Sequence, residues 1–177
     1  MTRIQLAGAA AAVLMAASLG ACARPEAARP AIDTGKIADA VKADEAQRYA
    51  DVNAHDPAKV ASHDAADAVS MFHGRPNAVG PDAIAAGFKA SLTDSPDLHV
   101  AASNQTVDVA ASGDLAVFHA TSVATFTDPK TKKPMTITSN SLAGYKPRAD
   151  GTWKIEWSVV SNTAPPPAPA PAPAPKS

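Results

Sequence analysis

Apolar residues recur at two different spacings along this chain, and the change of spacing separates a helical first half from a strand-rich second half. In residues 36–54, Val41, Tyr49 and Val52 recur near the spacing of one helix face. Beyond residue 98 the apolar positions instead alternate with polar ones, which is typical of half-buried strands. The pattern therefore predicts helices first and a sheet afterwards.

Two shorter helices are predicted from their start signals. The Asp56-Pro57 pair supplies a capping side chain and a proline at the first helical position, which predicts a short helix ending near Ser62. The Gly80-Pro81 pair opens a third helix. Its apolar residues are expected in register along one face: Ile84, Phe88 and Leu92.

Several segments have the composition and the boundaries of strands. Turns that contain glycine, proline or aspartate bound residues 67–73, 98–109, 114–127, 134–146 and 152–162. The last segment alternates most clearly, and on one of its faces we expect Trp153, Ile155, Trp157 and Val159. Short turns between the last four of these segments predict an antiparallel meander. Three helices on one face of a curved antiparallel sheet form an α+β domain.

The first residues have the three parts of a bacterial export signal. Arg3 precedes an uncharged run over 4–21, and this run leads into Leu-Gly-Ala-Cys at 19–22. These four residues resemble the lipobox of bacterial lipoproteins, in which the cysteine thiol is acylated and becomes the new N-terminus. The resemblance implies a signal peptide over residues 1–22 and a lipid anchor on Cys22.

Two other interpretations of this leader are considered. Residues 21–23 (Ala-Cys-Ala) also fit ordinary secretory cleavage, which would leave a soluble periplasmic or secreted protein. A transmembrane helix needs about 20 predominantly apolar residues, and this alanine-rich run is too weakly hydrophobic for one. In the lipoprotein case, Ala23 stands where an aspartate would resemble an inner-membrane retention signal. We therefore expect the outer membrane of a Gram-negative cell, facing the periplasm.

Composition places one domain between two flanking segments. Residues 23–33 carry prolines among alanines and charges and indicate a tether, whereas 164–177 alternate alanine with proline and indicate an extended, disordered tail. The domain is expected over 34–163. A net charge of -1 without a basic stripe argues against a nucleic-acid partner. A single cysteine excludes an internal disulfide.

Several short segments occur in a characteristic order between residues 36 and 162. They are 47–51 (Gln-Arg-Tyr-Ala-Asp), 53–56 (Asn-Ala-His-Asp), 65–69 (Ala-Ala-Asp-Ala-Val), 80–84 with Phe88, 112–117 and 144–155. Together they resemble the nuclear-transport-factor-2-like superfamily, near its ketosteroid isomerase and polyketide cyclase branches. The resemblance implies a cystatin-like cone, in which three N-terminal helices pack on a curved antiparallel sheet.

The same resemblance implies positions for a catalytic site. In ketosteroid isomerases a carboxylate at the end of the first strand moves the proton, while a tyrosine and a protonated aspartate hold the enolate oxygen. By position these groups correspond to Phe72, Tyr49 and Ser141. A phenylalanine accepts no proton, so such a mechanism requires the neighbouring His73 as its base. A shift of one residue along the strand exchanges which of Phe72 and His73 faces the pocket.

Two functions of different class follow. In the first, a membrane-anchored domain binds a small apolar ligand or a protein partner without catalysis. In the second, the domain is an enzyme of the isomerase, cyclase or hydrolase kind that uses Tyr49 and His73. The missing carboxylate favours the first function. Mostly apolar residues are expected to line the pocket: Tyr49, Val52, Phe72, Phe88, Leu92, His119 and Trp157.

The remaining polar residues indicate neither a metal nor a cofactor. Asp51 and His55, like His63 and Asp67, have the spacing of helical ligand pairs, but no third ligand converges with either pair. Asp64 is expected on a solvated face.

A second copy of the chain is the remaining expected partner. Relatives of this fold commonly pair through the outer face of the sheet, so the resemblance implies a homodimer. Phe118, Phe126 and Val160 are expected on solvent-directed positions of that face, where they would form apolar patches.

Overall fold

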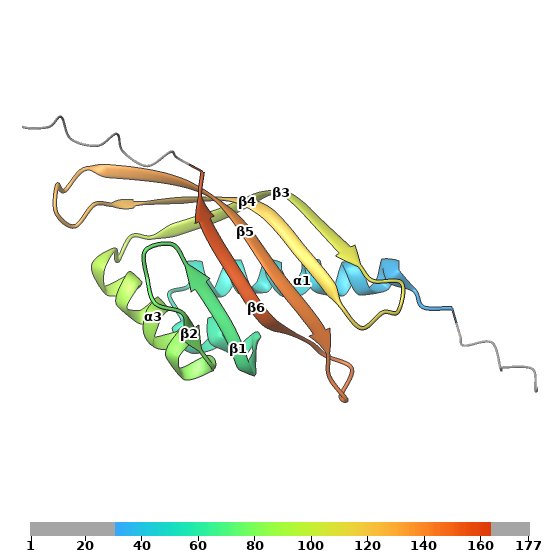
Figure 1. Ribbon diagram of the computed structural model, residues 1–177. Helices are drawn as coiled ribbons and strands as arrows, with labels where there is room; N and C mark the ends of the chain where they lie inside the picture. Colours follow the sequence, from blue (N-terminus) through green and yellow to red (C-terminus); the bar gives the residue numbers. More distant parts are fainter. Residues whose placement is uncertain (1–30, 164–177) are drawn as a thin grey trace, which may run out of the picture. The chain divides into compact units, whose positions relative to one another are not determined.

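A six-stranded sheet carries the helices on one of its faces (Figure 1). The structure is a computed structural model and describes residues 31–163. Its elements are α1 (Thr34–Asn53), α2 (Pro57–Ser62), β1 (Asp64–Phe72), β2 (Ala78–Val79), α3 (Pro81–Asp94), β3 (His99–Val109), β4 (Ala116–Thr127), β5 (Pro134–Pro147) and β6 (Trp153–Asn162). The expected leader with Cys22, most of the tether and the tail lie outside the described residues. None of the helices described is long and apolar enough to span a membrane.

The helices begin at identifiable caps. Asp56 accepts the backbone N–H of Lys59 (3.0 Å) and Pro57 occupies the first turn of α2, as predicted. Gly80 precedes α3 with a φ of 80°, a left-handed conformation that favours glycine. α1 starts slightly earlier than predicted, because the Asp33 carboxylate accepts a backbone N–H of its first turn.

The sheet is mixed and not wholly antiparallel. Its strands lie in the order β2-β1-β6-β5-β4-β3, and β1 runs parallel to β6 while every other neighbouring pair is antiparallel. The predicted meander is confirmed for β3 to β6, which short turns connect. The expected sheet was antiparallel throughout, and this is wrong at β1, because the chain leaves β1 through β2 and α3 and re-enters the sheet at the opposite edge, in β3.

A β-bulge in β6 changes which residues face the helices. Ile155 pairs with Tyr145, and Trp157 pairs with Gly144, so Glu156 is an extra residue between two consecutive pairs. Ile155 is fully buried in the core. Beyond the bulge the alternation is inverted, which places Trp157 on the outer face. The predicted common face for Ile155 and Trp157 is therefore wrong.

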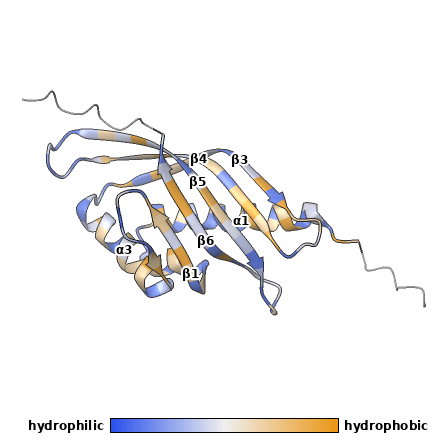
Figure 2. Cartoon of the chain, in the orientation of Figure 1, coloured by the Kyte–Doolittle hydropathy of each residue, from blue (hydrophilic) through white to orange (hydrophobic). Residues whose placement is uncertain are grey.

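The main core lies between α1 and the sheet. Val41 of α1 packs with Phe118 of β4, Tyr145 of β5 and Ile155 of β6, and none of these side chains is more than 1% exposed. Apolar and polar bands alternate along these strands (Figure 2). The prediction of Phe118 on the outer face is wrong, because the alternation of β4 directs it toward α1.

Candidate functional site

A cavity of about 460 Å³ lies between α1, α3 and the inner face of the sheet. Its wall consists mainly of aromatic and aliphatic side chains: Val52, Phe72, Ile84, Phe88, Val100, Phe126, Ile137 and Val160. The rim is formed by the loop after β1, the end of α3 and the turn between β4 and β5. A cavity of this size and lining is typical of a site for a small organic molecule.

A chain of hydroxyl groups crosses the cavity from α1 to β5. The Tyr49 hydroxyl bonds the Ser122 hydroxyl of β4 (2.8 Å), which in turn bonds the Ser141 hydroxyl of β5 (2.6 Å). On the neighbouring strands, the Ser158 hydroxyl donates to Ser70 (3.1 Å). Serine hydroxyls donate and accept hydrogen bonds without carrying charge. The sheet therefore offers a ligand neutral polar contacts.

The end of β1 presents a phenylalanine to the cavity and a histidine to its rim. Phe72 follows the buried Ser70 on the inner face, and its ring meets that of Phe88 edge-on with centroids 6.1 Å apart. The next residue, His73, is exposed. Strand alternation thus directs Phe72 inward and leaves the only titrating group of this pair beside solvent.

Arg48 of α1 is the cationic side chain in the deep part of the wall. Its side chain is 13% exposed, its Nη1 lies 3.7 Å from Glu45 Oε2, and its guanidinium carbon lies 5.9 Å from the centre of the Phe88 ring. Burial acts to lower the pKa of Arg48, but the charges of Glu45 and Asp64 raise it, and the net shift is upward. Arg48 therefore stays charged against an apolar cavity.

Next to this arginine lies a buried network of carboxylates. The Tyr145 hydroxyl contacts Glu45 Oε1 (2.9 Å) and Asp44 Oδ2 (3.0 Å), so two carboxylates share its proton. His63 Nδ1 bonds Asp44 (2.8 Å), and its Nε2 bonds Asp51 (3.0 Å). Both ring nitrogens face carboxylates, an arrangement that favours the imidazolium form, in which both nitrogens donate.

Burial and hydrogen bonding act in opposite directions on the pKa values of this network. Burial lowers the pKa of His63, but its bonds to Asp44 and Asp51 raise it above the usual value. Burial raises the pKa of Asp51, but the bonds from His63 and Gln47 lower it below the usual value. Both Asp64 oxygens are buried without a hydrogen-bond partner among the described residues, and burial raises the pKa of Asp64 to about 6. The expectation of Asp64 on a solvated face is wrong, because β1 begins at this residue beneath α1.

The two members of each residue pair with metal-ligand spacing (Asp51 with His55, and His63 with Asp67) do not contact each other. His63 contacts Asp51 instead of Asp67, and His55 Nε2 lies 3.0 Å from the Leu98 carbonyl oxygen. Within residues 31–163, no three histidine, cysteine, aspartate or glutamate side chains gather in a metal-binding arrangement.

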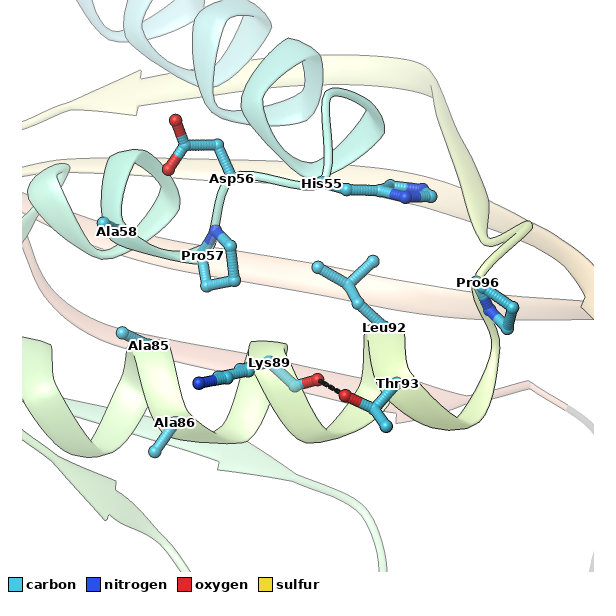
Figure 3. Close-up of a pocket in the computed structure, with 10 residues that line it drawn as sticks. All are labelled: His55, Asp56, Pro57, Ala58, Ala85, Ala86, Lys89, Leu92, Thr93 and Pro96. Carbon is cyan, nitrogen blue, oxygen red and sulfur yellow. Dashed lines mark hydrogen bonds between the residues drawn. The ribbon is translucent and has the colours of Figure 1, made fainter.

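The predicted lining residues divide between the cavity and other places. The cavity brings together Tyr49, Val52, Phe72 and Phe88. Leu92 instead points toward the joint between α1 and α2, where a shallow groove is formed (Figure 3). Its predicted position is wrong, because Leu92 lies eight residues beyond Ile84 and is rotated by about 80° from the face of α3 that lines the cavity.

His119 and Trp157 lie on the outer face of the sheet, so their prediction as lining residues is wrong. His119 follows the inward-facing Phe118, and its ring nitrogens bond Thr106 (3.1 Å) and Asp108 (2.7 Å) of β3. Trp157 lies beyond the bulge in β6 and covers Gly144.

Phe126 and Val160 were predicted on the outer face of the sheet, and this is wrong, because both line the cavity. The same two-residue alternation that turns Phe118 inward also turns Phe126 inward. The bulge in β6 does so for Val160.

Neither Arg48 nor Ser122 of β4 had a predicted role. Arg48 precedes Tyr49 on α1 and resembles any solvated helix position in the sequence. Ser122 follows Phe118 and Ala120 at two-residue spacing, so the alternation would have indicated it once Phe118 was known to face inward.

Comparison with known proteins supports the same fold. The model of the SnoaL-like domain matches residues 46–154. A ketosteroid isomerase-like protein from Erwinia carotovora atroseptica is 23% identical, with 72% of this chain and 96% of that chain covered and a TM-score of 0.60. An NTF2-like protein with a cystatin-like fold from Novosphingobium aromaticivorans is 18% identical (73% and 84% covered, TM-score 0.61). The hexachlorocyclohexane dehydrochlorinase LinA-type3 from Novosphingobium barchaimii is 16% identical (78% and 94% covered, TM-score 0.65). No curated protein matches the chain. These likenesses confirm the predicted α+β, cystatin-like fold.

Proposed function

The chain belongs to the SnoaL-like domain family, and on that basis we propose that its domain binds a small, mainly apolar ligand in the cavity without transforming it. The observation that carries this proposal is the lining of the cavity. Apolar side chains form most of its wall and neutral hydroxyls cross it. Phe72, which accepts no proton, lines the cavity at the position to which the resemblance assigns the base of a ketosteroid isomerase.

Acid–base catalysis requires a titrating group within hydrogen-bond reach of the substrate. The polar side chains of the cavity lining that are not exposed are hydroxyls, one asparagine amide and the guanidinium of Arg48, which holds its proton. An enzyme acting through Tyr49 and His73 is the alternative. The exposure of His73 at the rim supports binding over this alternative.

We also propose that a lipid on Cys22 holds the domain at the periplasmic face of the outer membrane. The support for this anchor is the leader sequence alone: an uncharged run that ends in Leu-Gly-Ala-Cys at 19–22. The cavity belongs to residues 48–162, so its ligand can be tested independently of the anchor.

A thermal-shift screen of small aromatic and aliphatic compounds tests the binding proposal. A ligand that binds the native state raises the melting temperature. Ala124→Trp fills the cavity and should abolish the shift, whereas Thr125→Trp, on the exposed opposite side of the same strand, should preserve it. No shift with any compound, or equal shifts in both variants, would contradict binding in the cavity.

A further inference from the structure

The guanidinium of Arg48 has unused hydrogen-bonding capacity. An arginine side chain carries five N–H donors in a planar fork. No hydrogen bond joins this fork to another described residue, and Nε is fully buried without a partner. Its nearest anion, Glu45 Oε2, is 3.7 Å from Nη1, which is longer than a hydrogen bond. Because Nε has almost no accessible surface, a ligand in the cavity would meet the guanidinium through its Nη groups, which make no hydrogen bond to another described residue.

The charges that line the cavity favour an anion. The ionisable side chains of its wall and rim are Arg48, Arg75, His73 and Asp94. All but Arg48 are exposed, so the buried charge that a ligand meets is the guanidinium, which Glu45 and Asp64 balance in part from outside the lining. The carboxylate of Glu45 does not line the cavity. It is held by Tyr145 and contacts the guanidinium from outside the lining.

The planar shape of the Arg48 guanidinium favours a carboxylate among the possible anions. A guanidinium matches a carboxylate through two parallel hydrogen bonds, and such charge-assisted bonds are about twice as strong as neutral ones. A phosphate dianion would bring a second negative charge to an apolar cavity that supplies one deep cation. The Phe72 and Phe88 rings next to Arg48 leave apolar surface for the rest of the molecule.

We propose that Arg48 binds the carboxylate of an amphipathic organic acid whose apolar body fills the cavity. This inference rests on the proposed function, because it names the class of ligand for the same cavity. Ser122 can donate the hydrogen bond that joins it to Tyr49, and the Tyr49 hydroxyl is then a further donor to the same head group.

Isothermal titration of the purified full chain with naphthylacetate and with naphthylacetamide tests the proposal. The two probes share their shape, but only the acid carries a negative charge. We expect the acid to bind about tenfold more tightly than the amide. Arg48→Gln should reduce the affinity for the acid to that for the amide, and Arg48→Lys should restore part of it. Arg148→Gln, which removes an arginine outside the cavity, should preserve the preference.

Each outcome separates this proposal from the proposed function. Equal affinity for acid and amide would overturn the role of Arg48 and leave ligand binding intact, as would an acid preference that survives in Arg48→Gln. Binding of neither probe would overturn this proposal, whereas a thermal shift with any other compound of the screen would leave the proposed function standing. Circular dichroism shows whether Arg48→Gln folds. If it does not, the ratio of the affinities for acid and amide is measured for the unsubstituted chain and for Arg48→Lys. A ratio of one in the unsubstituted chain refutes the proposal.

Discussion

Asp64 provides a sharp test of the buried network, because its carboxylate is 6% exposed and neither oxygen has a hydrogen-bond partner among the described residues. Asp64→Asn keeps the shape of the side chain and removes its ability to ionise. We expect this variant to gain stability relative to the parent chain as the pH rises, because the parent must bury a charge there and the variant does not.

The magnitude follows from the pKa of Asp64, which burial raises from 3.8 to about 6. In the folded chain the Asp64 carboxyl keeps its proton up to about pH 6. In the unfolded chain the same carboxyl loses its proton near pH 4. The folded state therefore binds more protons in this window, and the free energy of unfolding falls as pH rises. The full effect is about 3 kcal/mol, of which about 2 kcal/mol falls between about pH 4 and pH 7.

Urea denaturation of both proteins at several pH values measures this difference. Asp67→Asn is the matched control, since it removes the same charge from an exposed position of the same strand and should follow the parent at every pH. The reasoning is refuted if the stability difference between Asp64→Asn and the parent is constant with pH. His63 contributes in the same direction as Asp64, because its raised pKa adds stability that is lost as pH rises through the folded value.

Further predictions concern the cavity, the sheet and the chain's partners. Tyr49→Phe should weaken ligand binding about fivefold in a titration, because a single neutral hydrogen bond contributes about 1 kcal/mol. Gly144→Ala should lower the free energy of unfolding by about 1–3 kcal/mol, because a methyl group there overlaps the Trp157 indole. Intact mass spectrometry of the mature protein should show acylated Cys22, and an unmodified chain that begins at Arg24 would contradict the anchor. Light scattering should give a dimer if the outer face, where Leu142 is 36% exposed, pairs with a second copy; a monomer at micromolar concentration argues against pairing.

Local signals in the sequence predicted the elements well, but the pairing of strands only in part. The Asp56-Pro57 and Gly80-Pro81 pairs mark helix starts because caps act within a few residues. The parallel pairing of β1 with β6 joins segments far apart in the chain, and no turn signal reports it. The bulge at Glu156 is one extra residue in a regular alternation, and it exchanges the faces of all later residues in β6.

The residues of the candidate site could likewise be predicted only in part. Tyr49 could be predicted at the cavity because the family resemblance and the period of its helix agreed, whereas the sequence left open whether Phe72 or His73 faces it. Arg48 and Asp64 could not be predicted, because a charged residue in a sequence is usually solvated and only tertiary packing reveals that it is buried. Their role depends on partners from α1, β1 and β5, which no single segment contains.

The most direct test of the central claim is an NMR titration of the isotope-labelled protein with naphthylacetate. Binding in the cavity predicts that the largest shifts occur at the methyl groups of Val52, Ile84 and Val160, and that no signals of a product of the ligand appear during the experiment. Absence of shifts, shifts concentrated at Leu142 on the outer face, or conversion of the ligand would contradict the account.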